Sequence, residues 1–126
     1  MAETILVVDD EPEVRALARE VLESLGYTVF DTGDPQQALR IVKERPVQLL
    51  LTDVVMPIMN GLELAKRVEA VNPAIKVVVM SGYQTADIAP SGRPFLPKPF
   101  SVKALGDRVR DALARPSAFA RPRRST

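Results

Sequence analysis

The sequence predicts an α/β protein built on a doubly wound, five-stranded parallel sheet. Short apolar runs alternate along the chain with segments in which apolar residues recur every three or four positions, and the connections between them are short. The run over residues 47–52 is largely apolar on both faces, which is typical of a central strand covered by helices on each side. These two observations together favour a parallel sheet over an antiparallel one.

The first strand is expected over residues 4–8, and it ends at two adjacent acids, Asp9 and Asp10. Glu11-Pro12 then opens a helix, because proline suits the first turn, and Gly26 ends it. One face of this helix is expected to pack on the sheet through Val14, Leu17, Ala18, Val21, Leu22 and Leu25.

A short strand follows over residues 27–31, and Asp34-Pro35 supplies an N-cap and a first-turn proline for the second helix. Pro46 separates this helix from the central strand. That strand stops at one carboxylate, Asp53, so this side chain should stand at the carboxyl end of the strand, where open α/β sheets bind ligands.

The third helix is expected to begin after Gly61 and to end at Asn72-Pro73. Residues 75–80 form the next strand, which Ser81-Gly82 ends. Over residues 84–94 the helical pattern weakens, and three breakers leave room for at most two turns: Pro90, Gly92 and Pro94. A fourth helix is therefore expected to be short, irregular or absent.

The end of the domain is expected to hold a brief edge strand at Phe95-Leu96, a turn at Lys98-Pro99-Phe100 and a final helix that Ser101 caps. Its inward face is predicted to consist of Val102, Leu105, Val109, Ala112 and Leu113. We expect one domain over residues 1–115. We expect residues 116–126 to form a disordered basic tail, rich in Pro and Arg, or the remnant of a linker.

Composition narrows the possible chemistry. The chain has 126 residues, with 17 Lys and Arg against 16 Asp and Glu, so its net charge argues for neither a nucleic-acid nor a membrane partner. It contains no Cys and no His, which excludes disulfides, thiolate zinc sites, imidazole ligands and the usual catalytic triads. No apolar stretch could span a bilayer and no signal peptide is recognisable, so a cytoplasmic protein is expected.

Five polar residues should meet at one edge of a parallel sheet, because each follows the end of a strand: Asp9, Asp10, Asp53, Ser81 and Lys98. Each pair of carboxylates at about 4 Å would repel by roughly 4 kcal/mol at an effective dielectric of about 20. A hard divalent cation with oxygen ligands, most simply Mg²⁺, would offset this repulsion. Phosphoryl transfer needs in-line positioning and neutralised oxygens, and Asp53 is placed to act as the nucleophile.

In this order the motifs resemble the receiver domains of two-component response regulators, including receivers of hybrid histidine kinases. The resemblance covers about residues 3–114 and rests on Asp9-Asp10, Asp53 with Met56-Pro57 and Gly61, Ser81-Gly82, and Lys98-Pro99-Phe100. It implies a flavodoxin-like fold and a phosphoryl group accepted by Asp53 from a sensor histidine kinase or a histidine phosphotransfer protein. The absence of histidine in this chain agrees with a donor on another protein.

The resemblance also implies roles for individual residues. Asp10 and Asp53 would bind Mg²⁺ directly, Asp9 would bind it through water, and the backbone carbonyl of Val55 would complete the protein ligands. Ser81 and Lys98 would hold the phosphoryl oxygens, and the Lys98-Pro99 peptide would be cis, a form seldom found except before proline. Phosphorylation would draw in Ser81 and Phe95 as a switch that reports to an output protein.

Two departures from the family pattern concern the output half of the domain. The interval from Ser81 to Lys98 is shorter than the family usually shows, and Phe95 lacks the hydroxyl of a tyrosine. A receiver-fold binding module that signals without phosphorylation therefore stays an alternative. A Mg²⁺-dependent phosphohydrolase is another, although such enzymes usually carry an acid at the position that Val55 occupies.

Overall fold

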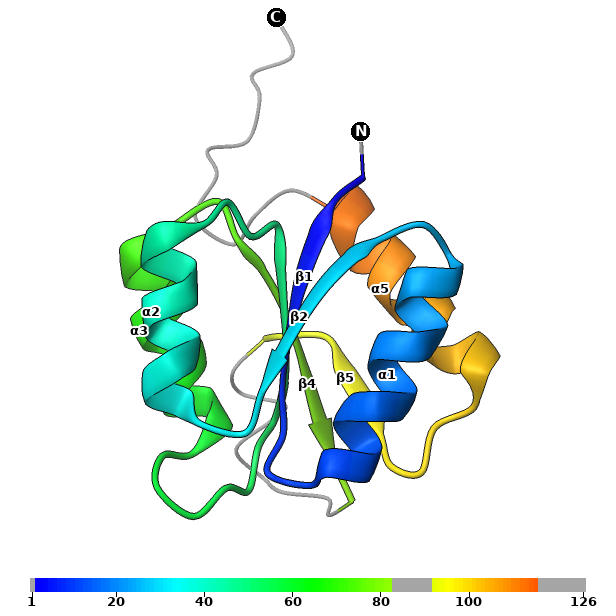
Figure 1. Ribbon diagram of the computed structural model, residues 1–126, viewed down its shortest axis with the longest axis horizontal. Coiled ribbons are helices and arrows are strands. Elements are labelled where there is room, and N and C mark those ends of the chain that lie inside the picture. The colour runs from blue at the N-terminus through cyan, green and yellow to red at the C-terminus, as the bar shows by residue number, and fades with distance from the viewer. Residues whose placement is uncertain (1, 83–91, 116–126) are drawn as a thin grey trace, which may run out of the picture.

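The computed structural model describes residues 2–82 and 92–115, and these form alternating strands and helices (Figure 1). The elements are β1 (Thr4–Val8), α1 (Pro12–Ser24), β2 (Thr28–Thr32), α2 (Pro35–Glu44), β3 (Leu49–Asp53), α3 (Gly61–Val71), β4 (Lys76–Ser81), β5 (Phe95–Pro97) and α5 (Val102–Ala114). The predicted irregularity of the fourth helix falls mainly on residues 83–91, which lie outside the described residues. Within the described ranges, no helix combines the length and apolar character that crossing a membrane requires.

The strands form one parallel sheet in the order β2-β1-β3-β4-β5, which confirms the predicted fold class. The register aligns the carboxyl ends of the strands: Val8 pairs with Thr32 and Thr52, Asp53 pairs with Met80, and Ser81 pairs with Pro97. Because β3 occupies the centre, its last residue lies in the middle of this edge.

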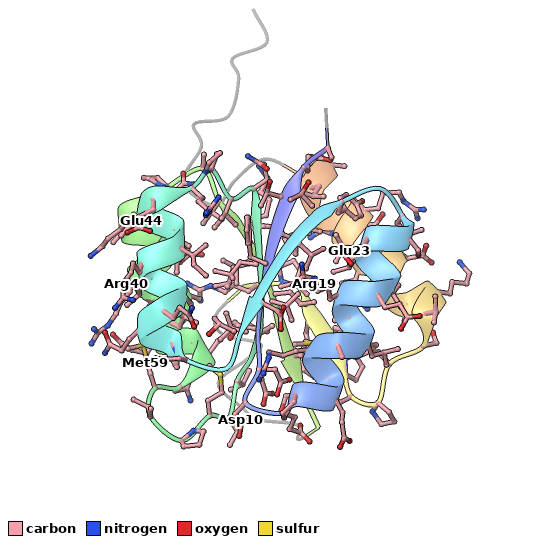
Figure 2. All side chains as sticks on the ribbon, in the orientation of Figure 1. Asp10, Arg19, Glu23, Arg40, Glu44 and Met59 are labelled. Atoms are coloured by element: carbon pink, nitrogen blue, oxygen red, sulfur yellow. The ribbon has the colours of Figure 1, made fainter. Side chains whose placement is uncertain are left out.

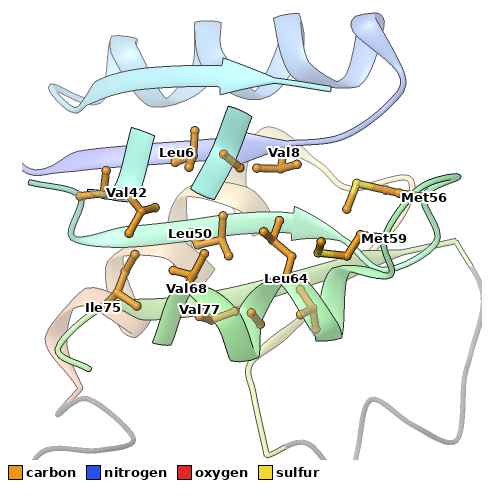
Figure 3. Close-up of a cluster of buried hydrophobic side chains, with 14 of the residues drawn as sticks. Leu6, Val8, Val42, Leu50, Met56, Met59, Leu64, Val68, Ile75 and Val77 are labelled. Atoms are coloured by element: carbon orange, nitrogen blue, oxygen red, sulfur yellow. The ribbon is translucent and has the colours of Figure 1, made fainter. Parts of the chain in front are cut away.

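Among the described residues, α2 and α3 cover one face of the sheet, and α1 and α5 cover the other (Figure 1). Successive strand residues alternate between the two layers: Leu6 and Leu50 belong to the core under α2 and α3 (Figure 3), whereas Ile5, Leu49 and Leu51 belong to the core under α1 and α5. All five are fully buried. This period of two explains why the central strand is apolar on both faces.

Capping side chains set the helix starts. Asp34 Oδ1 accepts a hydrogen bond from Gln36 N at 2.9 Å, and Ser101 Oγ accepts one from Ala104 N at 3.0 Å, as predicted for both. Asn60 caps α3 in the same way. Gly26 has φ +99°, a left-handed conformation that favours glycine and turns the chain from α1 into β2.

Three residues predicted to face the core are exposed: Leu17 by 45%, Leu25 by 54% and Val102 by 61%. Leu17 lies at the border of the apolar stripe of α1, whereas the buried residues Ala18 and Leu22 lie nearer its centre. Leu25 is the C-cap of α1 and Val102 is the first residue of α5, so both extend past the contact between helix and sheet. The prediction was wrong here because periodicity alone does not show where a helix leaves the sheet.

An acidic site at the carboxyl edge of the sheet

The candidate site lies where the strands end. Asp9 and Asp10 follow β1, Asp53 is the last residue of β3, and Lys98 follows β5. These ends share the lower edge of the sheet in Figure 1, and Figure 2 shows Asp10 there, near the start of α1. The backbone N–H of Lys98 donates to Ser81 O at 2.9 Å, which ties the end of β5 to the end of β4.

The three aspartates converge. One carboxylate oxygen from each of Asp9, Asp10 and Asp53 lies within 4.8 Å of the others. Asp9 is fully buried and Asp53 is 6% exposed, whereas Asp10 faces solvent. The sheet therefore holds two of the carboxylates rigidly while the third closes the group from the outside.

Lys98 supplies positive charge to this group. Its Nζ lies 2.7 Å from Asp9 Oδ2 and 3.4 Å from Asp53 Oδ2, and it donates to Glu11 Oε1 at 3.2 Å. Burial of the ammonium opposes its charge, but the neighbouring carboxylates of Asp9 and Asp53 outweigh burial and raise the pKa of Lys98. The lysine is therefore held in its charged form.

The same surroundings disfavour the charged form of Asp53, whereas they favour the charged form of Lys98. Burial, and then the charge of Asp9, raise the pKa of the Asp53 carboxyl to about 6, although Lys98 and the Val54 N–H stabilise the carboxylate. Asp53 Oδ1 accepts that N–H at 3.0 Å. One ammonium thus balances only part of the charge of the cluster.

The residues present fit a hard cation. Asp9 Oδ1 accepts a hydrogen bond from Glu11 N at 2.9 Å, and Asp9 Oδ2 is buried against the Lys98 ammonium, 2.7 Å away. Carboxylate oxygens gathered in this way are the ligands that Mg²⁺ prefers, whereas softer metals favour imidazole nitrogen and thiolate sulfur, and the chain has no His and no Cys.

The remaining predicted residues lie around this group. Ser81 ends β4 and is 2% exposed, and Val55 is 53% exposed in the loop after β3. The Lys98-Pro99 peptide is cis. Phe95 begins β5, pairs in register with Val79 and packs, partly buried, against the core under α2 and α3.

A cleft of about 700 Å³ opens over the carboxylates. Its polar lining comes from Asp10, Glu11, Asp53 and Lys98, and its apolar wall comes from Val14, Leu17, Val55, Pro99 and Phe100. Leu17, which the sequence assigned to the core, thus lines this cleft. The cleft gives a ligand or partner access to Asp53 from one side.

Two site residues were not found from the sequence. Glu11 binds Lys98, and Arg15 Nη1 donates to the backbone oxygen of Asp9 at 2.7 Å. Glu11 directly follows the acid pair, which was a usable signal. No sequence signal pointed to Arg15, because its ion-pair partner Asp31 lies on β2, and only the fold brings that strand beside α1.

The raised pKa of Asp53 leads to a stability prediction for the metal-free protein. The unfolded carboxyl has the ordinary value of 3.8, so between 3.8 and about 6 the folded state binds more protons, and stability from this group rises as pH falls. Asp53→Asn should stabilise the protein at pH 7 by about 1 to 3 kcal/mol, and the gain should shrink by pH 5. Urea unfolding at both pH values measures this, and a gain independent of pH would contradict it.

A flavodoxin-like parallel sheet with three acids and a lysine at its carboxyl edge defines the receiver class of signalling domains. The chain belongs to this family: residues 5–110 match the model of the response regulator receiver domain. The resemblance seen in the sequence is thereby confirmed.

Similarity to individual proteins agrees with membership of this family. The chain is 38% identical over 117 residues to the DNA-binding transcriptional regulator NtrC of Azospirillum brasilense, covering 89% of this chain and 24% of that protein. It is 36% identical over 119 residues to sporulation initiation phosphotransferase F of Bacillus subtilis, covering 90% of this chain and 95% of that protein. The crystal structure of the receiver domain from hybrid histidine kinase CckA matches with a TM-score of 0.77 and 38% identity, covering 87% of this chain and 98% of that one.

The chain thus spans about a quarter of the length of the NtrC relatives and nearly all of the phosphotransferase. Receiver domains are in general signalling modules of two-component systems rather than enzymes. The acidic cluster of this chain occupies the place where such domains typically bind Mg²⁺.

Proposed function

We propose that this chain is a phosphoacceptor receiver domain in which Asp53 takes a phosphoryl group from a phosphohistidine. The donor is a sensor histidine kinase or a histidine phosphotransfer protein. The observation that carries the proposal is the placement of the Asp53 carboxylate, at the carboxyl end of the central strand, in an open cleft and 3.4 Å from the Lys98 ammonium. The CckA receiver and the phosphotransferase that the chain resembles support the choice of donor.

Asp10, Asp53 and the backbone carbonyl of Val55 would hold Mg²⁺, with Asp9 contributing through water. The convergence of the three carboxylates, whose charge the single Lys98 ammonium offsets only in part, supports this assignment. When bound, the ion supplies positive charge to the phosphoryl oxygens and to the cluster. The exposed position of Val55 and its place in the lining of the cleft agree with a role at the mouth of the site.

The chain's own groups perform the transfer. A carboxylate oxygen of Asp53 forms a bond to phosphorus as the bond from phosphorus to the donor imidazole nitrogen breaks, and the imidazole leaves with that electron pair. The Lys98 ammonium pairs with a phosphoryl oxygen, exchanging part of its contact with Asp9 for the new charge. Ser81 donates its hydroxyl to another oxygen.

The signal would pass from Ser81 to Phe95. The two residues lie on adjacent strands, and Phe95 is only partly buried, so the core does not enclose its whole side chain. The phosphoryl oxygens on Asp53 can accept a hydrogen bond from the Ser81 hydroxyl. Phosphorylation therefore favours the conformation in which Ser81 and Phe95 have moved inward, and it shifts the equilibrium between two existing conformations. An output protein would read the altered surface near β4 and β5.

Intact mass spectrometry after incubation with acetyl phosphate tests the proposal. The parent chain should gain one phosphoryl group when Mg²⁺ is present and none when it is absent. Asp53→Asn should gain none, and Asp111→Asn, which alters an exposed acid on α5, should behave as the parent.

Failure of small donors would move the test to purified histidine kinases and phosphotransfer proteins. An adduct that persists in Asp53→Asn would overturn the assignment of Asp53. Mg²⁺ binding without an adduct from any donor would favour a binding module that acts without phosphorylation. Repeated turnover of phosphate esters would favour a phosphohydrolase.

A further inference from the structure

Arg15 connects the acidic loop to the edge strand of the sheet. Its Nη1 donates to Asp9 O at 2.7 Å, and its Nε donates to Asp31 Oδ2 at 3.1 Å. From this bridge we propose that Arg15 is a positioning residue of the metal site, which holds the peptide between Asp9 and Asp10 so that Asp10 faces Asp53. The inference rests on the proposed function, since it concerns the Mg²⁺ that these acids would bind.

The anchor of the bridge is itself fixed. Asp31 lies on β2, in register with Val7 of β1, and its second oxygen binds Arg19 Nη1 at 2.8 Å. Both oxygens of Asp31 therefore carry a guanidinium, and the side chains of Arg15 and Asp31 are each only 22% exposed. A partly buried, doubly held carboxylate gives Arg15 a rigid support rather than a loose surface contact.

Arg15 holds the chain at Asp9, directly after β1, where the chain leaves the sheet. Asp9 N still donates to Thr32 O of β2 at 3.2 Å, and Asp9 O points to Arg15. The carbonyl of Asp9 and the amide of Asp10 share one planar peptide, so holding that oxygen also fixes the direction in which Asp10 departs. Arg15 thus acts on Asp10 without touching its carboxylate.

Gly33 leaves the space that the guanidinium fills. A Cβ at this position would lie 2.7 Å from Arg15 Nη1 and 3.3 Å from Asp9 O. The backbone of Gly33 needs no left-handed conformation, so space alone accounts for the glycine. The loop after β2 therefore allows Arg15 to approach Asp9, which offers a second way to disturb the bridge without altering charge.

Positioning and simple electrostatics predict opposite results. Mg²⁺ requires nearly ideal octahedral geometry, and loss of the groups that orient metal ligands typically weakens binding about 10- to 100-fold. Removal of a positive charge near a cation site should instead strengthen binding. The sign of the change thus separates the two effects.

The test is calorimetric titration of the whole chain with Mg²⁺ at neutral pH, well below the unfolding temperature of each variant. Arg15→Gln should weaken Mg²⁺ binding at least about fivefold. Arg19→Gln is the matched control, because it removes the same charge and a contact to the same Asp31 but does not touch Asp9. Its affinity should fall far less than that of Arg15→Gln, because Arg15 keeps its own contacts with Asp9 O and Asp31 Oδ2.

Gly33→Ala should weaken binding in the same direction as Arg15→Gln while both charges remain, and it keeps the test decisive where Arg15→Gln folds poorly. Equal or tighter binding by Arg15→Gln, an equal loss in Arg19→Gln, or parental affinity in Gly33→Ala would each overturn the proposal. If the parent chain forms the Asp53 adduct and these variants bind Mg²⁺ with the parental affinity, only the role of Arg15 is refuted. If the parent chain binds no Mg²⁺, the proposed metal site and this inference are both refuted.

Discussion

Gly61→Ala should destabilise the protein by about 3 kcal/mol or more, because a Cβ at Gly61 would lie 1.9 Å from Asp53 O and 2.8 Å from Asp53 C. These are backbone atoms of the central strand, so they cannot move aside as a flexible side chain would. The Gly61 N–H also donates to Val54 O at 2.8 Å, which keeps the start of α3 against the end of β3. The helix propensity gained with alanine, about 1 kcal/mol, is too small to offset this overlap.

Gly106→Ala is the matched control for this substitution. Gly106 also lies in a helix, and its new Cβ would meet only the end of the exposed Leu25 side chain, at 3.0 Å. Since that side chain can turn away, Gly106→Ala should be neutral or stabilise the protein by up to about 1 kcal/mol. Urea unfolding compares the two variants, and a loss below about 1 kcal/mol for Gly61→Ala would contradict the prediction.

Lys98→Met should lower the stability of the metal-free protein at pH 7 by about 3 kcal/mol. The substitution leaves Asp9, which is fully buried, and Asp53 without the ammonium that lies 2.7 Å and 3.4 Å from their oxygens. Their repulsion then stands uncompensated. The deficit should shrink as pH falls, because protonation removes the repulsion, and it should shrink when Mg²⁺ is added.

Lys103→Met is the control for Lys98→Met, because it removes an ion pair with Asp107 in which the lysine is 84% exposed. Such surface pairs contribute about 0 to 1 kcal/mol. Adding Asp53→Asn to Lys98→Met should recover part of the loss, since fewer charges then remain unpaired. Equal stability of Lys98→Met and the parent without metal would refute the role assigned to the ammonium.

The candidate site could be predicted because its main residues follow strand ends that are visible in the sequence. Apolar runs that stop at Asp9, at Asp53 and at Ser81 mark three neighbouring strand ends, and parallel pairing requires these ends to share an edge. Lys98 could be added because the family motif around it is distinctive. The structure places the three acids and this lysine together, as expected.

Side-chain contacts around the site could not be predicted in the same way. Arg15 binds Asp31, sixteen positions along the chain, and Lys98 binds Glu11, eighty-seven positions away. Charge patterning along one helix shows neither pair, because each depends on which strand lies beside which helix. The close approach of Gly61 to Asp53 is likewise a result of packing α3 against β3.

The sequence by itself determined the alternation of strands and helices, the two-sided burial of β3 and the meeting of Asp9, Asp53 and Lys98 at one edge. These follow from local periodicity and from the geometry that every parallel sheet shares. Only the tertiary structure decided that Leu17 lines the cleft and that Arg15 holds the Asp9 carbonyl. Such features depend on helix position and side-chain reach, which are set when distant segments pack together.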